Sequence, residues 1–278
     1  MARKEQERRA VEAQRRADWA ARDAIVAAEE AKEAEQTARL RRCFLHRLSD
    51  GRRTALWGLV DLSTQELTTF APDASEPLVQ ALSKFQIVVG LDARLQLEAL
   101  GLEPSDWRLV DLKLPQKSRT LNRSGRKLRI TTELLIAGTT GISRPLAPPA
   151  KVAELASAAS TGKLERRLAA DLRALLAYYR YGAFHHYIRL RWGFLDEIIG
   201  VDWGLPGDPA LYEVLKHAMD TGSDLEVVTG SPPAMSDPWG RAVRCKCLEV
   251  ESWEAKLEVD GRVHWVLKSE IFAARVAR

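Results

Sequence analysis

The most distinctive chemistry in the sequence is a run of basic side chains between residues 117 and 129. The small polar residues Ser118, Thr120, Asn122 and Ser124 lie between them, and Gly125 adds conformational freedom. Lysine and arginine displace counterions from phosphates, so the run predicts contacts to a nucleic-acid backbone; a solvated basic loop is the alternative. The basic residues are Lys117, Arg119, Arg123, Arg126, Lys127 and Arg129, and Arg52 and Arg53 could extend the patch.

Three aspartates come at the ends of expected strands and could bind a divalent metal. Asp61, Asp92 and Asp111 each follow an apolar segment, and hard cations need such oxygen ligands. The alternative is that they cap helices or face solvent in turns, as aspartate usually does. Cys245 and Cys247 are spaced as CxC rather than CxxC, and no second pair exists. We therefore expect no bound metal and no cofactor.

Composition sets further bounds on function. The chain has 278 residues, a net charge of +4 and a pI near 9, which is compatible with a nucleic-acid partner. Three cysteines favour a reducing compartment. No apolar run approaches the roughly 18 residues that a membrane span needs. Because the sequence also begins without an apolar leader, we expect a cytoplasmic protein. The sequence contains neither a Gly-rich phosphate loop nor a Ser-His-Asp pattern, so it does not indicate another kind of catalysis.

The elements that must position these residues fall into three regions. Residues 1–42 contain no Gly or Pro and are rich in Ala, Glu, Arg and Lys, which predicts an exposed helical arm. Residues 43–200 begin with strand patterns, include an apolar QIVVGL strand, and end in helices, of which the longest is expected over LERRLAADLRALLAYYRYGAFHHYIRLR. This order predicts an α/β domain with a mixed sheet flanked by helices.

Residues 203–278 have a different pattern. A helix over ALYEVLKHAMDTG precedes short alternating strands, and Asp260-Gly261 predicts a tight hairpin turn. We expect a small β-barrel of SH3 or Sm type with a leading helix. Its tryptophans Trp239, Trp253 and Trp265 are equally compatible with barrel core and with contact residues.

Four features follow one another in order over residues 43–195. They are Val88-Val89-Gly90 before a helix over 93–100, a turn with Asp111, a Leu-rich segment at Leu128–Gly141, and Tyr178 on a long helix. This order resembles the DEDDy group of 3'-5' exonuclease domains in the ribonuclease H-like superfamily. The first feature is similar to the second motif of that family, the next two match its aspartate-bearing turn and its Leu-rich helix with a Thr-Leu-Gly ending, and Tyr178 matches the tyrosine of its last motif, Tyr-x-x-x-Asp. The resemblance implies a ribonuclease H-like fold.

The resemblance also implies two divalent metals about 4 Å apart, held by four carboxylates. Aligned on this sequence, the four ligand positions fall at Leu45, Arg47, Gln96 and Gly182, and only Tyr178 is retained. An arginine in place of a metal-binding glutamate repels cations, so two-metal cleavage is not expected. The C-terminal region faintly resembles the WYL type of Sm-like domain, which implies ligand, nucleic-acid or protein binding.

Three functions follow from these patterns. The favoured hypothesis is a catalytically inactive, exonuclease-like protein that acts as a nucleic-acid-binding or scaffold subunit of a nucleoprotein complex. Protein subunits would then dock on the arm or on the barrel. The alternatives are a metal-dependent nuclease with a rearranged site at Asp61, Asp92 and Asp111, and a pure protein–protein adaptor. Tyr178, Tyr179 and Tyr181 could stack on bases, although tyrosines on such an apolar helix are more often core.

Overall fold

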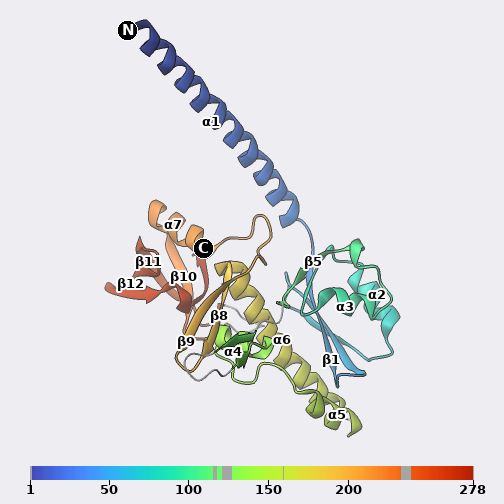
Figure 1. Cartoon of the computed structure of the whole chain (residues 1–278). Coiled ribbons are helices and arrows are strands. Elements are labelled where there is room, and N and C mark those ends of the chain that lie inside the picture. The colour runs from blue at the N-terminus through green and yellow to red at the C-terminus, as the bar shows by residue number, and fades with distance from the viewer. Residues whose placement is uncertain (1, 115–117, 121–126, 159, 233–238, 278) are drawn as a thin grey trace. The chain divides into compact units, whose positions relative to one another are not determined.

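The structure is a computed structural model of the chain (Figure 1). It describes residues 2–114, 118–120, 127–158, 160–232 and 239–277, without the side chains of 2–11, 13, 17, 18, 118–120, 127 and 128. Contacts divide the chain into two units, which are described separately. One comprises Met1–Leu40 with Leu205–Asp208, and the other comprises Arg41–Gly204 with Pro209–Arg278.

The first unit is the expected helical arm. Helix α1 runs over Ala2–Ala38, as its strong helix formers predict. Trp19, Ile25 and Val26 are exposed on it. The backbone of Gly207 approaches Ala34 so closely that a side chain there would strike the helix. The short segment 205–208 therefore packs against the end of α1.

The second unit begins with a five-stranded mixed sheet in the order β3-β2-β1-β4-β5. Strands β1 and β2 are antiparallel, as are β2 and β3, whereas β4 and β5 both run parallel to β1. The α/β prediction for this region is thus confirmed. The strands are β1 (Arg42–Ser49), β2 (Thr54–Asp61), β3 (Leu67–Phe70), β4 (Ile87–Gly90) and β5 (Arg108–Asp111).

Helices cover both faces of the mixed sheet. Helices α2 (Ser75–Leu82) and α3 (Ala93–Glu98) bury one face around Leu45 and Leu59. Helix α6 (Thr161–His185) covers the other face, where the rings of Phe44 and Tyr179 lie 6.4 Å apart. Helices α4 (Thr132–Thr140) and α5 (Pro149–Ser157) pack against α6, and a short 3-10 helix, η1 (Pro104–Asp106), precedes β5.

The helix expected to continue through IRLR ends earlier. Helix α6 stops at His185, and His186 takes a left-handed conformation (φ +59°). The next residues form an antiparallel hairpin of β8 (Tyr187–Trp192) and β9 (Leu195–Gly200). Ile188 and Leu190 are buried, whereas Arg189 between them is only partly buried. The spacing of buried residues therefore changes from the helical period to the two-residue period of a strand. Two further strands, β6 (Ser118–Thr120) and β7 (Lys127–Arg129), form a separate two-stranded sheet.

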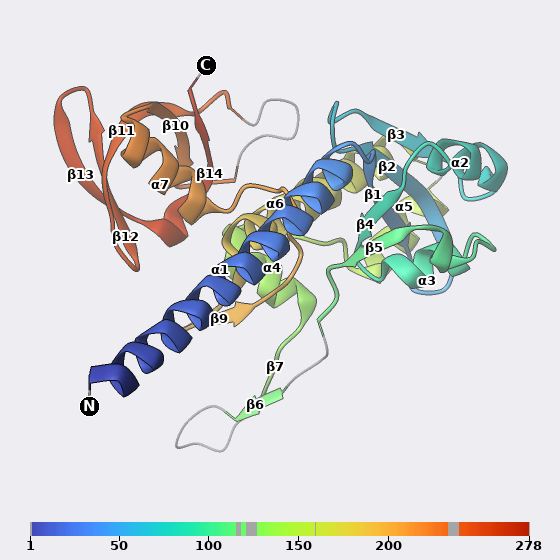
Figure 2. The same ribbon diagram turned by 90° about the horizontal axis from the view of Figure 1, so that it is seen from above.

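The C-terminal sheet is antiparallel, with the order β13-β12-β11-β10-β14. The expected turn at Asp260-Gly261 is confirmed, since both residues have positive φ. The expected barrel is not closed: among the described strands, the edge strands β13 and β14 do not pair (Figure 2). The elements are α7 (Leu211–Thr221), β10 (Asp224–Thr229), β11 (Val243–Val250), β12 (Glu254–Val259), β13 (Arg262–Leu267), 3-10 helix η2 (Lys268–Glu270) and β14 (Ile271–Val276).

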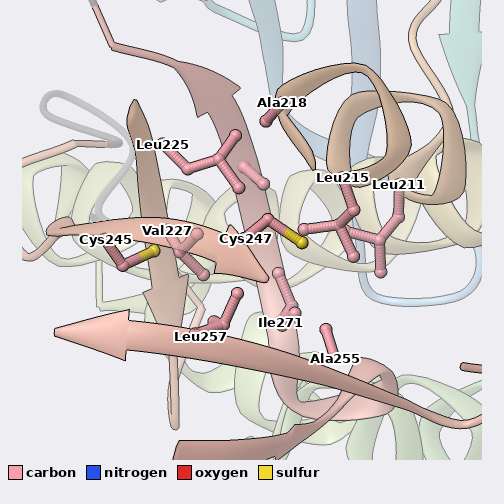
Figure 3. Packing of buried hydrophobic residues seen from close by; sticks show 11 residues of the cluster. Leu211, Leu215, Ala218, Leu225, Val227, Cys245, Cys247, Ala255, Leu257 and Ile271 are labelled. Carbon is pink, nitrogen blue, oxygen red and sulfur yellow. The ribbon is translucent and has the colours of Figure 1, made fainter. Parts of the chain in front are cut away.

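The core of this sheet lies beneath α7. Leu211 and Leu215 of the helix meet Leu225, Leu257 and Ile271 of the strands (Figure 3). Alternate residues of β10 and β12 point inward, which is the pattern of a sheet with one buried face. Within the described part of the chain, no helix is long and apolar enough to cross a membrane.

Gly138 lies where α4 packs closely on the β8–β9 hairpin. A Cβ at this position would lie 2.6 Å from the amide nitrogen of Arg191 and 2.7 Å from the carbonyl oxygen of Arg189. We expect Gly138→Ala to lower the free energy of unfolding by about 1–3 kcal/mol, because the backbone must move. Gly162→Ala, in the open first turn of α6, should instead raise it by about 0.5–1 kcal/mol. Equal effects in urea unfolding would contradict this packing.

Candidate nucleic-acid interface

Strand β1 carries no carboxylate on either face. Leu45 is buried among the α2 and α3 side chains, and the Arg47 guanidinium lies 6.0 Å from the centre of the Trp57 ring on the same face. Phe44 and His46 point to the opposite face, toward α6. Every residue of β1 is described and none is acidic. The strand therefore supplies no carboxylate ligand for a metal on either of its faces.

The motif positions suggested by the sequence do not converge. Leu45 and Gln96 lie together on the α3 side, where Gln96 Nε2 donates to the Leu91 carbonyl oxygen at 2.6 Å. Tyr178 and Gly182 instead belong to α6, on the other side of the sheet, and pack against Trp203. Leu45 and Arg47 therefore lie on the face of the sheet opposite these α6 residues, because the two-residue period of a strand sends 45 and 47 away from α6.

A buried ion pair lies where β1 faces α6. Asp171 is almost completely buried, forms an ion pair with Arg167, and accepts a hydrogen bond from the Ala147 amide at 3.1 Å. The His46 Nε2 atom lies 3.7 Å from the same carboxylate. The charge of Asp171, which is the one buried acid among the residues the structure describes, is thus balanced by Arg167. The sequence patterns did not single this residue out.

The rearranged carboxylate site is not assembled. Asp111 accepts a hydrogen bond from the Asp92 amide at 2.9 Å, so these two lie together at the ends of β4 and β5. Asp61 ends β2, from which three strand spacings of about 4.8 Å each separate β5. Asp61 also binds Arg41, and Asp92 binds Lys113. The three carboxylates therefore cannot share one metal.

Asp61 and Asp111 accept hydrogen bonds from the backbone amides of Ser63 and Lys113, as aspartates in turns commonly do. Burial raises the pKa of Asp61, but hydrogen bonds from Ser63 and Arg41 outweigh it and leave the pKa below its usual value. Among the described residues, no group of three His, Cys, Asp or Glu side chains could hold a metal. Cys245 and Cys247 point into the C-terminal core (Figure 3), and burial raises the pKa of Cys245 to about 11.

The basic cluster falls only partly within the described residues. Lys117, Arg123 and Arg126 lie outside them, and for Arg119 and Lys127 only the backbone is described. The ladder of β6 and β7 places residue 119 opposite 128 and residue 120 opposite 127. Arg129 is exposed at the end of β7. The hairpin therefore gathers the two ends of the cluster.

Arg52 and Arg53 lie exposed in the turn between β1 and β2. Their backbone amides donate to Asp50 Oδ1 at 2.8 and 2.6 Å, which fixes the turn. These bonds, the one from Arg53 foremost, lower the pKa of Asp50. The turn thus holds both arginine side chains toward solvent, as a phosphate contact requires.

The tyrosines considered for stacking are core residues. Tyr178, Tyr179 and Tyr181 are all buried, so they cannot receive a base. Exposed aromatic side chains described in the second unit include Trp192 and Phe194 around the β8–β9 turn, and Tyr212, Trp253 and Trp265. The aromatic residues beside the turn glycine in RWGF were the available signal for the first pair. Trp253 is 68% exposed and Trp265 is 48% exposed, so neither belongs to the buried core of the C-terminal sheet.

A cavity of about 500 Å³, here called the aromatic cavity, opens between the end of α6, the β8–β9 hairpin, the start of α7 and η2. Tyr212, Trp253 and Ile198 supply apolar surface, and Arg189, Asp196 and Lys268 supply charge. Lys268 Nζ lies 5.4 Å from the centre of the Tyr212 ring, and burial lowers the pKa of this lysine. An aromatic surface beside two cations is suited to a flat, anionic ligand.

Comparison with known proteins gives no relative to which these features could be referred: neither the models of protein families nor the curated proteins include a match to this chain.

The buried ion pair of α6 predicts a stability effect. Asp171→Asn removes the charge that balances Arg167, and we expect the free energy of unfolding to fall by about 3 kcal/mol. Glu165→Gln, at an exposed position on the same helix, should change it by less than about 0.5 kcal/mol. Urea unfolding at pH 7 measures both. A loss no larger at Asp171 than at Glu165 would show that the pair is not structural.

His185 makes stability depend on pH. Its ring stacks on Tyr181 at 4.0 Å, and its Nε2 atom lies 2.7 Å from the Ile271 carbonyl oxygen. Burial lowers its pKa to about 4 from 6.5, so the unfolded chain binds the proton more tightly. The stability that neutral, buried His185 maintains is fully present above pH 6.5 and is lost as the pH falls from 6.5 toward 4. By pH 4 the loss in the free energy of unfolding amounts to about 3 kcal/mol.

The pH effect is measured by urea unfolding at pH 7 and pH 4 for the wild type and for His185→Gln. The variant cannot titrate in this range, whereas the acidic residues common to both proteins still do. We expect the wild type to lose more stability than the variant over this interval. Equal losses would place His185 in a solvated environment and contradict its burial.

Proposed function

We propose that the protein is a non-catalytic nucleic-acid-binding or scaffold subunit whose mixed-sheet domain is ribonuclease H-like and of exonuclease type. Three antiparallel strands followed by two strands parallel to the first, with helices on both faces, support this fold. The observation that best supports the loss of catalysis is that β1 has no acidic residue on either face. Two-metal cleavage requires carboxylate ligands in this region.

Nucleic-acid binding is supported by the placement of positive charge. The β6–β7 hairpin gathers the ends of the basic cluster, and the β1–β2 turn presents Arg52 and Arg53 to solvent. Contacts of this kind act through phosphates and do not depend on base sequence. The overall pI near 9 agrees with such a partner.

Docking of other protein subunits is the second part of the proposal. Helix α1 exposes Trp19 and Val26 at a spacing of seven residues, which places them near one another on the helix. In the C-terminal region, a leading helix, five antiparallel strands and a 3-10 helix before the last strand are compatible with an open barrel of SH3 or Sm type. Its edge strand β13 exposes Val263, Trp265 and Leu267.

A mobility-shift titration with an end-labelled single strand of DNA or RNA tests the proposal. Six substitutions to glutamine remove the cluster at Lys117, Arg119, Arg123, Arg126, Lys127 and Arg129. The matched control changes six other exposed basic residues, Lys84, Arg94, Lys163, Arg166, Arg173 and Lys216. We expect the cluster variant to lose the shift and the control to keep it.

Salt dependence gives an independent readout of the same experiment. Each phosphate contact contributes about 0.7 to the slope of log affinity against log salt for a single strand. The cluster variant should therefore show a shallower slope than the control variant. Equal loss in the two variants would contradict a role for the cluster. No shift of the wild type at low salt would favour the pure protein–protein adaptor.

A further inference from the structure

The aromatic cavity leaves two large ring systems uncovered. Tyr212 is 52% exposed at the start of α7, and Trp253 is 68% exposed in the turn between β11 and β12. The two residues come from elements distant in sequence, yet they line the same cavity. A planar apolar group of a ligand could cover this surface by stacking, which contributes about 1–3 kcal/mol per base in single-strand binders.

The cavity wall also holds an oriented cation. Arg189 Nε donates to Asp196 Oδ1 at 3.1 Å, and its Nη2 pairs with Oδ2 of the same carboxylate. The remaining Nη1 is buried and has no hydrogen-bond partner within the described part of the chain. A buried donor left unsatisfied is costly, so a ligand acceptor that reaches it would be favoured. Lys268 provides a second cation beside the Tyr212 ring.

The surroundings of the cavity define where negative charge can lie. A neighbouring hollow shares Tyr212, Trp253 and Lys268 but adds the acids Glu251 and Glu254. These carboxylates repel an anion from that side. The Asp196 carboxylate on the same wall is balanced by Arg189 and Arg191. The anionic part of a ligand is therefore directed toward Lys268 and the Nη1 of Arg189, while its planar part lies over the aromatic rings.

We propose that the aromatic cavity binds one nucleoside monophosphate unit, with its base stacked on Tyr212 and Trp253 and its phosphate facing Lys268 and Arg189. A volume of about 500 Å³ lies in the range of small-ligand sites. The base of a duplex is covered by its neighbours, so only an unpaired base can enter. The ligand is either a free nucleotide or a nucleotide of a single strand, and the second case rests on the proposed function.

Two titrations distinguish these sources. Isothermal titration with adenosine monophosphate measures the free nucleotide, and fluorescence anisotropy compares a labelled 12-nucleotide single strand with a 12-base-pair duplex. The cavity variants are Tyr212→Ala, Tyr212→Phe and Trp253→Ala. Trp265→Ala is the matched control, because Trp265 is 48% exposed on β13 and lines neither hollow among the described residues.

We expect tighter binding of the single strand than of the duplex. Tyr212→Ala and Trp253→Ala should each weaken strand binding about 5- to 100-fold, as loss of one stacking partner does. Tyr212→Phe retains the ring, so it and Trp265→Ala should stay within about twofold of wild type. All three positions are exposed enough for the four variants to fold, which urea unfolding checks.

The outcomes separate the two proposals. Binding of the free nucleotide that depends on Tyr212 and Trp253, without strand binding, supports the cavity and overturns the proposed nucleic-acid function. Strand binding that is unaffected by both alanine variants but lost in the basic-cluster variant overturns the cavity proposal and leaves the proposed function intact. Binding of neither ligand overturns both.

Discussion

Burial of helix α6 is the constraint on which the second unit depends. Leu168 and Leu172 of this helix meet the backbone of Gly58, where a side chain would come within about 3 Å of them, so the helix approaches β2 closely. Its last turn contacts the C-terminal region, where Tyr181 donates a hydrogen bond to the Ser269 carbonyl oxygen and His185 bonds Ile271. One helix thus links the mixed sheet to β14. Its tyrosines Tyr178, Tyr179 and Tyr181 are buried by that packing.

The same packing leaves the described region between β1 and α6 without the carboxylates of a two-metal site. A two-metal site needs several carboxylates facing a solvated space. Here the Phe44 ring packs at a tilt near Tyr179, and the charge of Asp171 is balanced by Arg167 beside His46. The buried pair satisfies its own charges, which is the requirement for keeping an acid inside a core. A surface of this kind can support a fold and present loops, but it lacks the ligands for metal-assisted hydrolysis.

Much of the fold could be predicted from the sequence, because short apolar segments bounded by Gly, Pro or Asp mark β1 to β5 and the Asp260-Gly261 turn. The side of β1 that faces α6 could not be predicted. Residues 43–46 are buried on both faces of the sheet, so the alternation that normally identifies a face is missing. The end of α6 was also hidden, since His186 takes the left-handed conformation that glycine usually marks.

The candidate site was predictable only in part. The basic cluster and the absence of the family's carboxylates are visible in the sequence, whereas the exposure of aromatic residues depends on tertiary packing. Tyr178 and Tyr181, which the sequence left open to stacking although core was the more usual role, are buried. Trp253, for which core and contact were equally compatible, is exposed, and Tyr212, which no sequence pattern singled out, is exposed as well. Which aromatic side chains remain for a ligand is decided by how α6 and the C-terminal sheet pack.

The most direct test of the central claim is a cleavage assay on an end-labelled single strand with purified protein and Mg²⁺ or Mn²⁺. The absence of acidic residues from β1 and the separation of Asp61 from Asp92 and Asp111 predict a strand of unchanged length under conditions in which the protein binds it. Shortening that copurifies with the protein and disappears with EDTA would contradict the account, and would locate a metal site that this arrangement of carboxylates does not provide.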